Sequence, residues 1–564
     1  MERKKQIVLR RIVLFLLLLL PNIYATFRVN DLTLSPVKTL AYIVVVAVCL
    51  LFPAILLRSK TYFVAEGIMS VFCAPIEIAS IFLNHETASK TFLSLIYFTN
   101  RQEAFELVSS LWFLFILLIV IWVIYFLLAA KENQEWLLPK SIRITLLAFI
   151  PVLLISGLTV FCVIDKRMNP ATTTAHTLEK AANKLRLKFY KIFPYNFYIN
   201  SAEVIKEEFT ARQQLKAVES FSFGIDAKQD TMPEIVVLVI GETARSCNFS
   251  VNGYSRPTTP RLSRRDNLVS FTRAYSQANV TAIAVPHIIS RIDVQDNKLL
   301  YNEKNLVDAF HEAGFSNAWI SSQTVGTYTA RMLKTTDYHY QSGKGLSSVD
   351  NYDIRLVDEV NKAVDQLGCA KQMLVLHTMG SHWRYDSRYP EEFNVFRPSF
   401  DKHFNLAKFS ENIKEQLVNS YDNSILYTDY FLDSLMTSLD VLDIPVVLMY
   451  LSDHGENLYD DNRHLVLHSS SGGTRYEYNI PFIIWYSDEY AVQYPDKIEA
   501  LQNNKNQQFN SSVVFHTLLD AVGVEQGISR SKSLCSPQFC SMDTMFALTS
   551  NEKMIKILAD TIIH

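Results

Sequence analysis

Asp453 and His454 follow an apolar, β-branched run at residues 444–450 after only Leu451 and Ser452, so a carboxylate and an imidazole stand at the end of a predicted buried strand. Glu242 follows a second run, at residues 234–240, in the same way. Open α/β folds bind ligands at the sheet edge formed by the carboxyl ends of their parallel strands. We therefore expect the three side chains to meet there, where mixed oxygen and nitrogen ligands suit Zn²⁺ and, less well, Mn²⁺.

A hydroxyl group and several histidines complete the candidate site. Thr281 stands where a loop would enter a helix, and a metal together with a helix amino terminus would stabilise an alkoxide and a phosphorylated intermediate there. An Asp-His pair after a strand is by itself more often structural than catalytic, but a third apolar run, at 371–376, also ends in histidine, and this clustering favours catalysis. The histidines that could bind a second metal or protonate a leaving group are His377, His382, His464 and His468.

The elements that must position these residues alternate along the second part of the chain. Residues 305–313 have helical spacing and precede a strand at 316–321, and a helix at 418–439 precedes the central strand. A further strand is predicted at 478–485. This alternation is typical of an α/β sandwich with a mainly parallel sheet, which we assign to a soluble domain at residues 233–564.

The first 165 residues are far more apolar than the rest of the chain and predict a transmembrane domain of five helices. The third apolar run is the weakest candidate because Glu66 and Glu77 lie inside it, and carboxylates in a membrane are costly unless they face the interior of a helix bundle. The first run has the basic start of a signal peptide, but its long apolar core and the lack of a small-residue cleavage site favour an uncleaved helix. The five runs are 7–26, 39–57, 61–83, 105–130 and 142–164.

Lysine and arginine residues near the ends of these runs indicate the orientation of the bundle. The amino-terminal stretch and the loops on its side carry ten of them, and the opposite loops carry four. The positive-inside rule therefore places the amino terminus in the cytoplasm. An odd number of spans then places everything after Lys166 on the far side, which is the periplasm in a bacterial envelope protein. The formal net charge of -2 offers no general argument for nucleic-acid binding.

Two further segments leave alternatives open. Residues 166–232 are a predicted juxtamembrane linker, in which residues 178–191 have the spacing of a basic amphipathic helix on an anionic membrane surface. An ordinary linker helix is the alternative. Near the carboxyl end, Cys535 and Cys540 flank a short loop. They could close a disulfide in an oxidising compartment or remain two unpaired thiols.

Taken together, the apolar runs and five motifs resemble the membrane phosphoethanolamine transferases of Gram-negative envelopes, which belong to the alkaline phosphatase and sulfatase-like superfamily. The resemblance covers nearly the whole chain, and it implies a multi-pass protein of the bacterial inner membrane with a cytoplasmic amino terminus and a periplasmic catalytic domain. The motifs are Gly241-Glu-Thr-Ala-Arg245, Asn252-Gly-Tyr-Ser-Arg-Pro-Thr-Thr-Pro260, Thr281 followed by Val285-Pro286, His377-Thr-Met-Gly-Ser-His382 and Ser452-Asp-His-Gly-Glu456.

The resemblance also implies a zinc-dependent reaction with one or two zinc ions and a covalent intermediate. Phosphatidylethanolamine would transfer its head group to Thr281 and release diacylglycerol, and a phosphate or sugar of lipid A or the lipopolysaccharide core would then accept the group. The resemblance implies that the catalytic zinc is held by Glu242, Thr281, Asp453 and His454. It implies that a second zinc or the substrate phosphate is held by His382 and His468, with His377 close by and His464 as the alternative to His468. The residues implied to contact the lipid donor are Thr99, Asn100 and Glu103.

Departures from the family leave the acceptor open. Gln277 and His287 stand where members acting on lipid A often carry cysteines, and the segment at 321–331 looks more like the cysteine-poor members acting on core sugars. With either acceptor, capping a phosphate with a cationic amine would reduce the negative charge of the surface. Weaker binding of cationic antimicrobial peptides is the expected consequence.

Three other functions differ in how well this sequence fits their requirements. A glycerophosphate transferase of the lipoteichoic-acid type shares five spans and a threonine nucleophile, and its donor would be phosphatidylglycerol. An inactive envelope scaffold would keep the fold and bind without turnover. A sulfatase needs a cysteine or serine in a C/S-x-P-x-R setting for conversion to formylglycine, and nothing like it surrounds Thr281.

Overall fold

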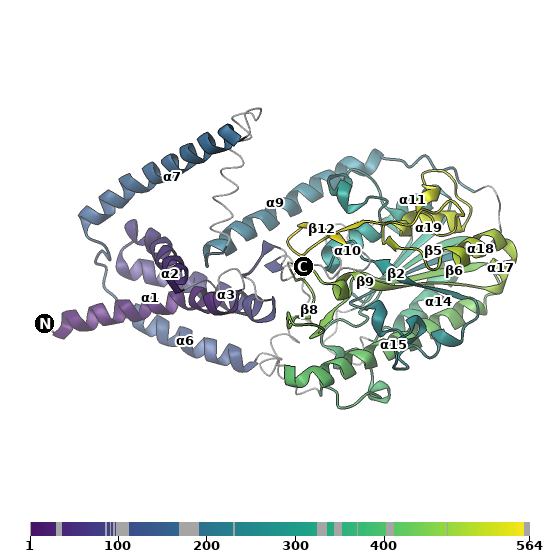
Figure 1. The fold of residues 1–564 in the computed structure, drawn as a ribbon, viewed down its shortest axis with the longest axis horizontal. Coiled ribbons are helices and arrows are strands. Elements are labelled where there is room, and N and C mark those ends of the chain that lie inside the picture. Colours follow the sequence, from purple (N-terminus) through teal and green to yellow (C-terminus); the bar gives the residue numbers. More distant parts are fainter. Residues whose placement is uncertain are drawn as a thin grey trace. The chain divides into compact units, whose positions relative to one another are not determined.

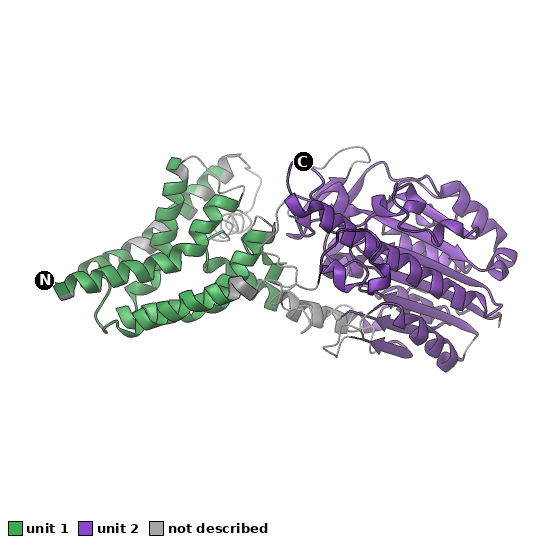
Figure 2. Cartoon of the chain, turned by 90° about the horizontal axis from the view of Figure 1, so that it is seen from below, with its two compact units in different colours: residues 1–94, 111–206 green, residues 95–110, 207–564 purple. Residues whose placement is uncertain are grey.

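The structure is a computed structural model, and it divides the chain into two compact units (Figure 2). The first comprises residues 1–94 and 111–206, and the second residues 95–110 and 207–564. This division falls at residue 206, whereas the sequence suggested boundaries at 165 and 232. The described residues are 2–29, 36–84, 87–90, 92–93, 96, 112–168, 177, 191–228, 230, 232–323, 335–342, 352–368, 370–401, 411–470 and 472–557. The predicted amphipathic segment 178–191 lies outside them except for Lys191.

One helix of the first unit lies in each of the five apolar runs (Figure 1). Within the described part of the chain, Lys4–Arg28 and Ser59–Phe82 are long and apolar enough to cross a membrane, and the other three helices contain shorter apolar stretches. The number of five spans therefore stays a prediction. The helices are α1 (Glu2–Arg28), α2 (Pro36–Leu51), α3 (Ser59–Asn84), α6 (Trp112–Ala130) and α7 (Lys140–Met168), and α9 (Tyr195–Ala217) follows them.

The two acidic residues of α3 are buried. Glu66 is 8% exposed and Glu77 is 1% exposed. The Glu77 carboxylate accepts hydrogen bonds from the Ala88 N–H at 3.1 Å and from the Asn196 side-chain amide at 2.7 Å. Both carboxylates thus meet the condition under which a membrane helix tolerates such groups, because they face the interior of the bundle.

The second unit is built on an eight-stranded sheet with the order β10-β2-β9-β6-β1-β5-β3-β4. Its strand pairs are parallel except where β9 lies antiparallel to both β2 and β6, so the prediction of a mainly parallel sheet is confirmed. The strands are β1 (Glu234–Gly241), β2 (Leu268–Tyr275), β3 (Ser316–Ser321), β4 (Tyr338–Gln341), β5 (Lys371–His377), β6 (Val446–Ser452), β9 (Asn479–Tyr486) and β10 (Phe509–Asn510). Two small antiparallel ladders pair β7 (Asn457–Leu458) with β8 (Val466–Leu467) and β11 (Met545–Leu548) with β12 (Met554–Ile557).

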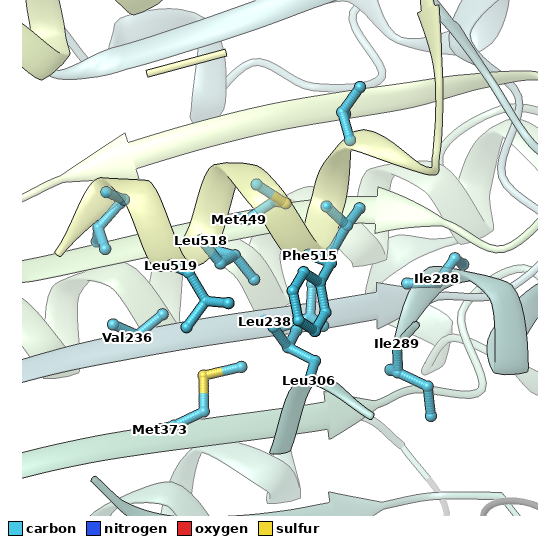
Figure 3. Close-up of a cluster of buried hydrophobic side chains, with 14 of the residues drawn as sticks. Val236, Leu238, Ile288, Ile289, Leu306, Met373, Met449, Phe515, Leu518 and Leu519 are labelled. Carbon is cyan, nitrogen blue, oxygen red and sulfur yellow. The ribbon is translucent and has the colours of Figure 1, made fainter. Parts of the chain in front are cut away.

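Helices cover both faces of this sheet. Alternate residues of β1 point to opposite sides, as the two-residue period of a strand requires. Val236 and Leu238 pack in a cluster with Phe515 of α19 (Figure 3), and Val237 packs on the other face with Tyr421 of α15. The helices of the second unit are α10 (Thr281–Ile288), α11 (Leu306–Glu312), α14 (Arg355–Leu367), α15 (Lys414–Asp440), α16 (Arg475–Tyr478), α17 (Asp488–Gln493), α18 (Pro495–Asn504) and α19 (Val513–Ala521).

The register of the central strands brings their carboxyl ends level with one another. Ile240 of β1 is paired with His377 of β5, and Gly241 of β1 is paired with Ser452 of β6. The residues that follow these three strands therefore meet at one edge of the sheet. This is the edge at which the sequence predicted a metal site.

The two cysteines near the carboxyl end are free thiols. Cys535 is 2% exposed and belongs to the apolar cluster that contains Phe515, whereas Cys540 is exposed. The disulfide considered from the sequence is therefore not present. The physical reason is that one side chain is packed in the core while the other faces solvent.

Candidate metal centre

Glu242, Asp453 and His454 form a buried cluster at the sheet edge. One ligand atom from each residue lies within 4.8 Å of the other two, and all three side chains are 0% exposed. His454 Nε2 is 3.5 Å from Glu242 Oε1 and 3.5 Å from Asp453 Oδ2. Two carboxylates buried so close together repel each other and have lost their hydration. A cation held between them would relieve both costs.

The hydrogen bonds around the cluster hold Asp453 through Oδ1 and His454 through Nδ1. Asp453 Oδ1 accepts from the backbone N–H groups of Thr243 and His454 at 3.1 and 2.7 Å, while Asp453 Oδ2 is buried without a partner among the described residues. His454 Nδ1 lies 2.8 Å from the Gly455 carbonyl, to which it donates, so Nε2 carries the free lone pair. Such outer hydrogen bonds orient metal ligands. Two oxygens and one imidazole nitrogen fit zinc.

The pKa values of the two carboxyl groups reflect this crowding. Burial and the charge of Glu242 raise the pKa of Asp453 to about 7. For Glu242, burial also favours the neutral form, but His454 and His382 outweigh it and lower the pKa to about 2. A bound divalent cation favours the ionised form of both groups, since it would be the largest charge in the site.

Thr281 is the first residue of α10, and Val280 before it has an extended backbone, so the loop enters the helix at the position predicted. Thr281 Oγ1 donates to Glu242 Oε2 at 3.0 Å and lies 3.3 Å from His454 Nε2. The hydroxyl therefore borders the cluster at the amino end of a helix, where developing negative charge is stabilised. A nucleophile at this position can reach a phosphorus atom bound beside the cluster.

The structure separates the four candidate histidines. The ring of His468 lies 4.3 Å from that of His454 and 6.3 Å from that of His382, measured between centroids. His377 ends β5 and is buried, with neither ring nitrogen hydrogen-bonded to another described residue; burial lowers its pKa to about 4. His464 is exposed in the turn between β7 and β8. His382 and His468 thus lie beside the cluster, and His464 faces solvent.

Several residues of the site were not identified from the sequence. The Gln323 side-chain amide donates to Glu242 Oε2 at 2.8 Å, and Thr243 Oγ1 donates to Glu242 Oε1 at 2.5 Å. Glu456 belongs to a motif that was recognised, but its role was not: its carboxylate contacts His468 Nδ1 at 3.2 Å and the Tyr385 hydroxyl at 3.0 Å. Gln323 follows β3, so its place after a strand was a usable signal, although an amide is not a preferred zinc ligand. Thr99, Asn100 and Glu103 lie outside the described residues.

Comparison with protein families matches residues 234–524, about half of the chain, to the Sulfatase family. Among characterised proteins, the phosphoethanolamine transferase EptA of Helicobacter pylori is 31% identical over 337 residues, which are 58% of this chain and 60% of the relative. The chain thus matches less than two thirds of that relative's length.

Two solved structures extend this comparison. The C-terminal periplasmic domain of EptC from Escherichia coli, in complex with Zn, has a TM-score of 0.54 and 25% identity, covering 60% of this chain and 96% of that domain. The integral membrane protein lipooligosaccharide phosphoethanolamine transferase A (EptA) from Neisseria meningitidis has a TM-score of 0.69 and 21% identity, covering 93% of this chain and 97% of its own. At that identity the second structure carries an argument about fold alone.

Proposed function

We propose, from the premise that this chain belongs to the Sulfatase family, that it transfers phosphoethanolamine from phosphatidylethanolamine to an envelope glycolipid. The observation that carries the proposal is the contact of the Thr281 hydroxyl with the buried cluster of Glu242, Asp453 and His454. This arrangement suits a covalent transfer of a phosphoryl group. The similarity to a transferase of that specificity supports the choice of group.

In the first step the phosphodiester of the donor lipid would be cleaved. The Thr281 hydroxyl loses its proton to water, and its oxygen bonds to phosphorus while the bond from phosphorus to the diacylglycerol oxygen breaks. The diacylglycerol oxygen takes a proton, for which the protonated imidazole (imidazolium) of His382 is the candidate donor. Phosphoethanolamine is then held as a diester on Thr281.

In the second step the acceptor hydroxyl would give its proton to the now neutral His382 and its oxygen would bond to phosphorus, while the bond to Thr281 Oγ1 breaks and the threonine oxygen takes a proton back from water. Glu242, Thr281, Asp453 and His454 would hold the catalytic zinc. When bound, zinc supplies Lewis acidity, which lowers the cost of an alkoxide and of the charge on phosphorus. His382 and His468 would hold an acceptor phosphate or a second zinc, with His377 close by.

The lipid substrates require a membrane location for the enzyme. The five apolar helices would span the inner membrane with the amino terminus in the cytoplasm, and the second unit would lie in the periplasm. Thr99, Asn100 and Glu103 would contact the lipid donor. Lipid A and the lipopolysaccharide core are both acceptors of the proposed chemistry, and addition of an amine to either would weaken the binding of cationic antimicrobial peptides.

The proposal is tested by measuring the intact mass of the purified full-length protein after incubation with each lipid. With phosphatidylethanolamine we expect wild type to gain the mass of one phosphoethanolamine group and to release diacylglycerol. Thr281→Ala should gain no mass, because the nucleophile is missing, whereas Thr281→Ser keeps a hydroxyl and should gain the same adduct more slowly.

The other outcomes distinguish the alternatives. An adduct formed only from phosphatidylglycerol would assign the chain to glycerophosphate transfer. Zinc-loaded wild type that forms no adduct with either lipid would overturn the covalent mechanism and support an inactive scaffold. An adduct on Thr281→Ala would place the nucleophile elsewhere.

A further inference from the structure

A buried carboxylate outside the metal cluster connects two segments of the site. Glu477 lies in the short helix α16 and is 0% exposed. Its Oε1 accepts from the Ser470 N–H at 2.9 Å and from the Asn279 side-chain amide at 3.0 Å, and its Oε2 accepts from the Ser470 hydroxyl at 2.5 Å. The same Asn279 amide also donates to the Ser470 carbonyl at 2.9 Å. The buried side chains of Asn279 and Glu477 and the half-buried Ser470 thus close a triangle of hydrogen bonds.

Two corners of this triangle lie close in sequence to a residue of the proposed reaction. Asn279 precedes Thr281 by two residues, and Ser470 follows His468 by two residues. The backbone of α16 adds a third segment, because the Gly455 N–H donates to the Glu477 carbonyl at 2.7 Å. The segments that carry the nucleophile, the metal ligand His454 and His468 therefore all contact Glu477.

The segment around His468 needs such support because its backbone is strained. Leu467 and Ser469, on either side of His468, have φ angles of 63° and 72°. This left-handed region is rarely adopted by residues other than glycine, and such strain persists only where the surroundings hold it. The Asn457 amide donates to the Leu467 carbonyl at 2.7 Å, and the Ser550 hydroxyl donates to the Ser469 carbonyl at 2.8 Å. Glu477 completes this set of supports.

We propose that Glu477 is a positioning residue that holds Thr281 and His468 in a fixed relation to each other, acting through Asn279 and Ser470. This inference rests on the proposed function, in which Thr281 accepts the phosphoryl group and His468 lies beside the acceptor phosphate. The group at this position must accept from three donors at once, which suits a carboxylate. Without it, the Asn279 amide and the Ser470 N–H lose an acceptor inside the protein, where the loss is costly.

The test uses two variants at this position in the full-length protein and follows the two half-reactions separately. Glu477→Ala should slow both the formation of the Thr281 adduct and its discharge to acceptor by about 100-fold each, the loss typical of a misplaced reacting group. Glu477→Gln should retain most of both rates. Its carbonyl oxygen still accepts from Asn279 and the Ser470 N–H, and its amide can donate to the Ser470 hydroxyl.

Ser550→Ala is the matched control, because it removes a hydrogen bond from the same strained segment without touching Asn279. We expect it to slow discharge and to leave adduct formation at the wild-type rate. Amide hydrogen exchange provides a readout that is independent of activity. Glu477→Ala should speed exchange in peptides covering 279–288 and 466–470, with exchange in β1 unchanged, whereas Ser550→Ala should affect only the second peptide.

Unchanged half-reactions in Glu477→Ala, or a loss confined to one of them, would overturn the inference. If Glu477→Ala does not fold, Asn279→Ala decides the matter, because it removes the hydrogen bonds of the nucleophile segment to Glu477 and to the Ser470 carbonyl and leaves both bonds between Ser470 and Glu477 in place. It should slow adduct formation and spare discharge, and normal adduct formation would contradict the inference. Wild type that forms no adduct would refute the proposed function, and the exchange pattern would still decide whether Glu477 joins the two segments.

Discussion

At the scale of single residues, the direction of lone pairs distinguishes the side chains of the site. His454 donates from Nδ1 to a carbonyl and turns Nε2 toward two carboxylates, and one buried oxygen of Asp453 accepts no hydrogen bond from the residues that the structure describes. His468 is oriented in a similar way, because its Nδ1 faces the Glu456 carboxylate at 3.2 Å. A histidine whose other nitrogen is bound to a carboxylate is well suited to hold a metal or a phosphate.

This orientation leads to a prediction for a matched pair of histidines. His468→Ala should slow the transfer of phosphoethanolamine to acceptor by about 10- to 100-fold, the range found when groups supporting a metal site are removed. His464→Ala should keep the wild-type rate, because His464 is exposed in the nearby turn. The measurement is the rate at which a preformed Thr281 adduct is lost on addition of acceptor. Equal effects of the two substitutions would contradict the assignment of His468.

At the scale of elements, the site depends on how closely short segments approach one another. Strand β6 ends at Ser452, and the residues after it must pass α16 before the β7–β8 ladder begins. Gly455 allows this passage: a Cβ atom there would lie 2.1 Å from the Tyr476 carbonyl oxygen, a distance that real Cβ contacts do not reach. The contact is with backbone, so it cannot be relieved by turning a side chain.

We therefore predict opposite results for two glycine substitutions. Gly455→Ala should force α16 and the segment after His454 apart, and thereby reduce both zinc content and adduct formation by at least about 10-fold. Gly472→Ala should be neutral, because a Cβ atom at Gly472 has no neighbour within 4 Å. Zinc per chain and intact mass after exposure to phosphatidylethanolamine measure both effects. Normal zinc binding by Gly455→Ala would show that the backbone can shift without loss of the site.

At the scale of the whole molecule, the chain combines an apolar helical unit with an α/β unit. The ten positive charges beside the apolar runs on one side and the four on the other predict that the second unit is exported. Its exposed Cys540 offers a probe of this orientation, since a thiol on the protein surface reacts with a maleimide.

The prediction concerns cells from which the outer membrane has been removed. In a variant whose only cysteine is Cys540, a membrane-impermeant maleimide should label the protein in intact spheroplasts. In a variant whose only cysteine is introduced by Lys4→Cys, labelling should require lysis, because the amino terminus is predicted to be cytoplasmic. The opposite pattern, or labelling of both in intact spheroplasts, would refute the predicted topology.

Much of the second unit could be predicted from the sequence, because strand formation and strand ends are local properties. The β-branched runs before Glu242 and Asp453 form β1 and β6, and the register of these strands brings both carboxylates to one edge. Thr281 begins a helix beside them, as its setting between loop and helix indicated. These conclusions depend on side-chain period and residue type within short windows.

Other features were decided only by tertiary structure. The sequence left His464 and His468 as alternatives; in the structure His464 is exposed in the turn between β7 and β8, whereas His468 follows β8 and lies beside His454. Apolar runs do not reveal strand direction, so the antiparallel placement of β9 was not foreseen. Glu477 had no motif at all: its partners lie up to 198 residues away in the chain, and only packing brings such residues together. Local pattern thus predicts which side chains stand at a strand end, whereas contacts between distant segments determine which of them share a site.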